Sequence, residues 1–174
     1  MSVLQFVTQT LDDEWMADVS ERTVAVPKPE IVLQSESSNE RLEYEDVIKV
    51  ADGGVQTIEP AGLGYNTERV ETLVTLDIRS TDSNRPDVPG AIGEPGRVRM
   101  FGYRDEYSME SERYGGLVGE VRRIAHGLRK GEAEFDLVAT PEVNDLTAQV
   151  GMNKYRVEVL LRFTQLTADV EPGY

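Results

Sequence analysis

The stretch ERVETLVTLDIRS, Glu68–Ser80, decides the fold, because apolar and polar side chains alternate along it. Val70, Thr72, Val74, Leu76 and Ile78 fall on alternate positions, and most positions between them are polar or charged. A period of two places successive side chains on opposite faces of a β-strand. The stretch therefore predicts a strand with one face in a core and the other face toward water.

A second stretch with the same period, YRVEVLLRFTQLT, occupies residues 155–167 near the C-terminus. Its apolar positions alternate with Arg156, Glu158 and Arg162, which predicts another half-buried strand. Three shorter apolar runs bounded by turn residues predict further strands, with sequences EIVLQS, YEDVIKVADGG and EFDLVATPEV.

Two helices are predicted from apolar residues that recur at steps of three and four. The first spans about 3–18, where Ser2 and Gln5 have the spacing of a capping box. The second is a central helix over about 106–129, ended by Gly131. Its apolar stripe, with Glu120, Arg122, Arg123 and Arg129 on the opposite side, consists of Tyr114, Leu117, Val118, Val121, Ile124, Ala125 and Leu128.

These elements predict the α+β class, with an antiparallel sheet packed by the central helix and the N-terminal helix. The length of 174 residues fits one domain, which we expect to span 1–168. Residues 169–174 are expected to form a loose C-terminal tail.

A long segment rich in proline and glycine, 82–104, separates the predicted strand at 68–80 from the central helix. Long connections without regular structure are uncommon in compact domains and are often functional. We expect this segment to be an arm that packs on a neighbouring subunit, because prolines limit its freedom and it ends in apolar and basic side chains. A surface loop without such a role is the alternative. The candidate interface residues are Arg97, Val98, Arg99, Met100, Phe101, Tyr103 and Arg104.

The chain is strongly acidic, with 32 acidic and 18 basic residues and a net charge of -14. Such a charge repels nucleic acid and anionic membranes, because phosphate binding requires a basic surface. Only four of the basic residues are lysines. Acidity with few lysines is typical of proteins from salt-loving organisms, where salt screens the self-repulsion. An acidic protein from an ordinary habitat is the alternative.

The residues that usually carry catalysis are scarce. The chain has no cysteine and one histidine, His126, so thiol chemistry, a disulfide and a two-histidine metal site are excluded. Acidic clusters such as Asp12 to Glu14 lack the spacing of a calcium loop. We therefore expect no enzyme, with no catalytic, cofactor-binding or metal-binding residues. No run of about 20 apolar residues predicts a membrane span.

The order of the elements resembles that of the tail terminator and tail-completion proteins of tailed viruses. The resemblance covers about residues 1–168 and rests on an N-terminal helix, strands, the strand RVETLVTLDIRS, a loop, the helix YGGLVGEVRRIAHGLRKG and a final hairpin that ends in YRVEVLLRFTQL. The chain is longer than the family pattern, mostly within 34–66 and 82–104. Composition fits a virus of a halophilic archaeal host.

The resemblance implies a virion protein, assembled in the host cytoplasm, that forms a ring, typically a hexamer, at the junction of tail and neck. Its partners would be other copies of itself, the tail tube protein and the neck or connector proteins. Genomic DNA would pass through the lumen without sequence-specific binding. For ring contacts, we expect the edges of the strands at 69–79 or 155–164 to pair between subunits. Another neck or connector subunit, a non-viral scaffold protein and an enzyme with an unrecognised site stay open as alternatives.

Overall fold

The computed structural model describes residues 2–18, 25–33, 46–60, 68–82, 95–102, 115–128, 136–137, 141–151 and 154–167. Tyr103, Arg104 and the tail at 169–174 lie outside these residues. In chain order, the elements are α1 (Val3–Glu14), β1 (Glu30–Leu33), β2 (Val47–Pro60), β3 (Glu68–Thr81), α2 (Pro95–Phe101), α3 (Gly116–Gly127), β4 (Asp136–Leu137), β5 (Glu142–Asp145), the short 3-10 helix η3 (Thr147–Gln149) and β6 (Lys154–Thr167).

A six-stranded sheet in the order β1-β2-β3-β6-β4, with β5 also paired to β6, forms one layer of the molecule. The α+β class is confirmed. The prediction of a purely antiparallel sheet is wrong, because β1 runs parallel to β2, with Glu30 opposite Val47. Parallel neighbours need a connection long enough to carry the chain back to the same end of the sheet. The chain between Leu33 and Val47 has that length, so β1 can pair in parallel.

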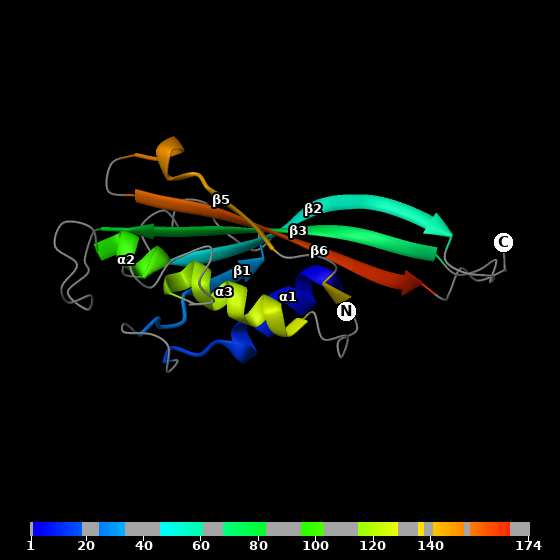
Figure 1. Ribbon diagram of the computed structural model, residues 1–174, viewed down its shortest axis with the longest axis horizontal. Helices are drawn as coiled ribbons and strands as arrows, with labels where there is room; N and C mark the ends of the chain where they lie inside the picture. Colours follow the sequence, from blue (N-terminus) through cyan, green and yellow to red (C-terminus); the bar gives the residue numbers. More distant parts are fainter. Residues whose placement is uncertain are drawn as a thin grey trace.

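The helices α1, α2 and α3 lie against one face of the sheet (Figure 1). This face carries the alternating apolar residues of the strands, and Val74, Leu76 and Ile78 of β3 are fully buried, as their spacing predicts. Phe6 of α1 meets Phe163 of β6 edge to face, with ring centroids 6.3 Å apart. Burial of such apolar side chains is the main stabilising contribution to the fold. The helical residues in this core are Val7, Leu11, Met100, Phe101, Leu117, Val118, Val121, Ile124 and Ala125.

The first helix has the predicted capping box, since Ser2 accepts from the Gln5 N–H and Gln5 accepts from the Ser2 N–H. It ends at Glu14, however, four residues before the predicted end. The indole N–H of Trp15 donates to the carbonyl of Val26 over 2.9 Å, and the Trp15 backbone is extended. A tertiary contact therefore ends the helix before the apolar pattern does.

The central helix begins at Gly116 rather than near residue 106, and residues 106–114 lie outside the described part of the chain. Gly115, just before it, has extended backbone. Gly116 adopts φ +66, and a Cβ there would lie 2.4 Å from the backbone of Met100. Only glycine adopts this conformation at so close an approach without strain. The start of α3 is thus fixed by its contact with α2.

Three strands are much longer than the helices that cover them. β2, β3 and β6 each contain 14 residues, which corresponds to about 45 Å of strand. α1 and α3 contain 12 residues each, or about 18 Å of helix. Figure 1 shows the paired ends of the three strands, which include Pro60, Glu68 and Thr167, extending past α1 and α3.

The prediction that the strands at 69–79 and 155–164 form edges is wrong. β3 pairs with β2 on one side and β6 on the other, and β6 pairs with β3 and with β4 and β5. These two strands contain the strongest apolar alternation, and the most apolar strands belong at the centre of the sheet because burial there is greatest. At the β1 edge, only residues 47–50 of β2 pair with β1.

Candidate subunit interface

The C-terminal part of the predicted arm folds back into the chain. Residues 95–101 form α2, in which Arg99, Met100 and Phe101 are 5%, 0% and 7% exposed. A Cβ on Gly96 would lie 2.6 Å from the backbone of Thr81, so α2 packs tightly on the end of β3. The expectation that these residues anchor a neighbouring subunit is therefore wrong for Arg99, Met100 and Phe101, because their own core buries them.

Arg99 holds α2 in place through a buried ion pair. Its Nε lies 2.6 Å from Oδ2 of Asp46, and its Nη2 donates to the carbonyl of Pro27. The hydroxyl of Ser80 donates to the other carboxylate oxygen of Asp46 over 2.8 Å. A buried charge must be paired and hydrogen-bonded to be tolerated. Arg99, which the sequence predicted to contact a neighbouring subunit, thus joins α2 to the residue before β2 and, through Asp46, to β3.

The other predicted interface residues are either partly exposed or outside the described part of the chain. Arg97 and Val98 are half-buried, and the guanidinium of Arg97 lies 5.9 Å from the ring centroid of Phe101. This distance is within the range of a cation–π contact. Tyr103 and Arg104 lie outside the described residues. The segment therefore offers little exposed apolar surface to a partner within its described part.

A charged cluster lies on the face of the sheet opposite the helices. Asp77 forms ion pairs with Arg79 at 3.0 Å and Arg156 at 3.1 Å. Arg79 and Arg156 are register partners in the pairing of β3 and β6. Like charges directly opposite each other destabilise a strand pair, so the shared carboxylate offsets their repulsion. We call Arg79, Arg156 and the nearby Lys154 the basic cluster.

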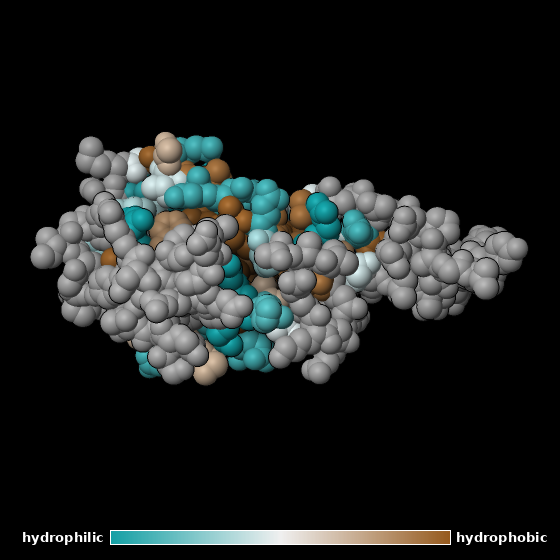
Figure 2. Space-filling model, viewed as in Figure 1, coloured by the Kyte–Doolittle hydropathy of each residue, from teal (hydrophilic) through white to brown (hydrophobic). Residues whose placement is uncertain are grey.

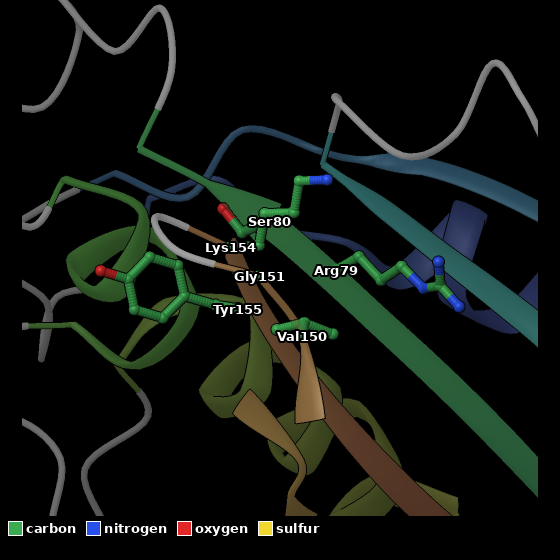
Figure 3. A pocket seen from close by; sticks show the side chains of 6 residues that line it. All are labelled: Arg79, Ser80, Val150, Gly151, Lys154 and Tyr155. Carbon is green, nitrogen blue, oxygen red and sulfur yellow. The ribbon is translucent and has the colours of Figure 1, made fainter. Parts of the chain in front are cut away.

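A hollow of about 150 Å³ adjoins the basic cluster, between the end of β3, the start of β6 and the turn after η3. Its lining consists of Arg79, Ser80, Val150, Gly151, Lys154 and Tyr155. Figure 3 shows that Arg79 and Lys154 extend to one side of the strands and the ring of Tyr155 to the other. The Tyr155 hydroxyl donates to Asp82 over 3.2 Å. The cationic side of this hollow can receive a carboxylate or another small anionic group.

Sequence reasoning missed the basic cluster, because it treated these residues only as the polar side of two strands. The signal was present as Arg79 in β3 and Lys154 and Arg156 in β6, but their proximity depends on the register of the two strands. In a chain with a net charge of -14, the three cations of the basic cluster outnumber Asp77 and its register partner Glu158 on this part of the strand pair. Such a surplus is an attractive site for acidic groups.

The described surface on the face seen in Figure 2 is mixed. In the view of Figure 2, hydrophilic and hydrophobic residues lie side by side over the strands. Among the large apolar side chains of the described ranges, Met16 is exposed, with 51% of its surface accessible. His126 is exposed, as expected for a solvated residue.

Within the described ranges, the helices are all too short or too polar to cross a membrane. The same part of the chain contains no group of three or more histidine or acidic side chains placed to hold a metal ion. Neither family models nor curated proteins match this sequence.

Proposed function

We propose that this chain is a structural virion protein that forms a ring at the junction of tail and neck. In this role it ends the tail tube and joins it to the head connector, with other copies of itself, the tail tube protein and the connector proteins as partners. The order of the elements supports this proposal, because it resembles that of tail terminator and tail-completion proteins. The observation that carries it is the length of β2, β3 and β6 relative to the helices.

The projecting ends of the three strands favour a subunit of an assembly. A small group of strands without a packed face is at best marginally stable in water. The ends of the three long strands extend past α1 and α3 (Figure 1), so the fold gains stability if a neighbouring copy covers these ends. In a ring, every subunit presents the same surface to the next, and each projecting group of strands acquires a partner.

The edge of β2 gives a second reason for assembly. Among the described residues, β1 pairs with residues 47–50 of β2, whereas β2 continues to Pro60. Unpaired backbone groups along a strand edge attract another strand. Register shifts in β2 between Asp52 and Gly54 and between Val55 and Thr57 bend this edge, which disfavours open-ended stacking and is compatible with a defined contact.

The acidic charge suits a ring through which DNA passes. A channel lined by carboxylates repels phosphate, so DNA slides without binding to the wall. We expect the ring to show no measurable affinity for duplex DNA at the salt concentration at which it assembles. A basic channel would instead bind DNA and lose that binding as salt rises.

Electron microscopy of the purified chain in molar salt tests the proposal. The expected images show closed rings of about six copies with an axial channel. Particles that remain monomers at every salt concentration would contradict the proposal. Open filaments would contradict the closed ring.

A further inference from the structure

The basic cluster is a place of positive charge on a chain that otherwise repels copies of itself. Arg79 and Arg156 flank Asp77 and engage both of its carboxylate oxygens, and Lys154 lies further along the same strand pair, opposite Thr81. The side chains of Arg79 and Arg156 retain 28% and 29% of their exposure, so solvent or a partner can reach them. Lys154 adds its charge at the rim of the hollow.

The end of α1 carries the opposite charge in an unfavourable position. Asp12, Asp13 and Glu14 are all exposed and form the last turn of the helix. The C-terminus of a helix has a partial negative charge, and acidic residues there cost a few tenths of a kcal/mol each. Lys28 offsets Asp12 over 2.9 Å. Asp13 and Glu14 make no ion pair with any residue that the structure describes.

We propose that the basic cluster of one copy receives Asp13 and Glu14 of a second copy of this chain. This inference rests on the proposed ring and names its contact. The hollow beside Arg79 and Lys154 has room for a carboxylate side chain, and Val150 supplies an apolar wall for its methylene groups. The acidic turn that is unfavourable within one chain is thereby stabilised by the next chain.

The two patches lie on opposite layers of the molecule, which determines the symmetry of the contact. The basic cluster is on the sheet face turned away from the helices, and the acidic turn belongs to a helix on the other face (Figure 1). A twofold dimer could join these unlike patches only if both lay on the same interface surface, because each copy must then contribute both patches to one contact. A head-to-tail contact joins unlike patches and generates a ring when the rotation closes.

Charge reversal with a matched control tests this contact. Lys154→Glu and Arg162→Glu change the net charge equally, and both residues lie on β6, but Arg162 is exposed away from the hollow. The assembly midpoint is measured by sedimentation at the lowest salt concentration that maintains the wild-type assembly. We expect Lys154→Glu to raise the concentration needed for assembly at least about tenfold and Arg162→Glu to raise it by less than about threefold.

The reverse change on the acidic side completes a double-mutant cycle. Glu14→Lys alone is expected to weaken assembly, although it lowers the overall repulsion, and Lys154→Glu combined with Glu14→Lys is expected to restore it. Glu142→Lys, at another exposed position, is expected not to restore it. Circular dichroism confirms that each variant is folded.

Four results would overturn the inference. Equal effects of Lys154→Glu and Arg162→Glu would show that only net charge matters. If the double variant assembles no better than Lys154→Glu alone, the acidic turn does not contact the basic cluster. If the wild type forms no ring, the proposed function fails together with this contact, whereas a ring that tolerates Lys154→Glu contradicts the contact alone.

Discussion

Oε1 of Glu120 lies 2.6 Å from Nε of Arg123, and this pair joins α3 to the end of α1. Glu120 is fully buried, and its Oε2 accepts the backbone N–H of Met16. Arg123 donates to the carbonyl of Glu14 over 2.7 Å, which satisfies a backbone group that the end of α1 leaves open. The sequence pattern places Glu120 on the solvent side of the helix, and the structure shows it at the contact of two helices.

Removal of the Arg123 guanidinium should destabilise the fold strongly. Arg123→Ala leaves the buried Glu120 carboxylate without its cation, and we expect the free energy of unfolding to fall by about 3 kcal/mol. Urea denaturation measures this change. Arg122→Ala, at the adjacent half-buried position, should change it by less than about 1 kcal/mol. Equal, small effects of the two substitutions would mean that the pair does not join the helices.

The glycines at the two ends of α3 should respond in opposite directions to alanine. Gly116→Ala forces a Cβ against the backbone of Met100 at positive φ, and we expect a loss of more than about 3 kcal/mol or failure to fold. A Cβ at Gly127 meets nothing within 4 Å. Gly127→Ala should therefore stabilise the helix by about 0.5–1 kcal/mol. Thermal unfolding of both variants checks the contrast.

The two described arginines of α2 provide a test of its place in the core. Arg99→Ala leaves Asp46 without its buried cation, and we expect a loss of about 3–5 kcal/mol in the free energy of unfolding. Arg97→Ala removes a half-exposed cation–π contact with Phe101 and should cost less than about 1 kcal/mol. Both are measured by urea denaturation of the monomer in low salt. If both variants unfolded like the wild type while assembly was lost, α2 would be an arm after all.

The sequence predicts the parts of the fold that depend on local periodicity. The alternation in Val70–Ile78 places Val74, Leu76 and Ile78 in the core, and Ser2 with Gln5 caps α1 as expected. Both signals arise from neighbours in the sequence, which the backbone geometry brings together without help from the rest of the chain.

Features that depend on distant contacts could not be predicted in this way. Arg99 looks like an exposed basic residue in a loop until Asp46, 53 positions away, is seen beside it. The basic cluster likewise needs the register that pairs Arg79 with Arg156. Periodicity cannot supply these contacts, because they depend on which strands become neighbours in the sheet. The sequence therefore predicts an interface on the arm, whereas the interface that we propose from the structure lies on the outer face of the sheet.

Sedimentation velocity at about 0.1 M and about 2 M salt tests the central claim most directly, because the Debye length falls from about 10 Å at 0.1 M to about 3 Å at 1 M. Subunits with a net charge of -14 repel each other strongly in dilute buffer. Apolar contacts between subunits do not weaken in salt, and the three cations of the basic cluster cannot offset the repulsion of the whole chain. We expect a species of about six copies at the higher salt concentration and a monomer at the lower one. A monomer at both concentrations would contradict the ring, and a ring equally stable at both would contradict the role assigned to the acidic charge.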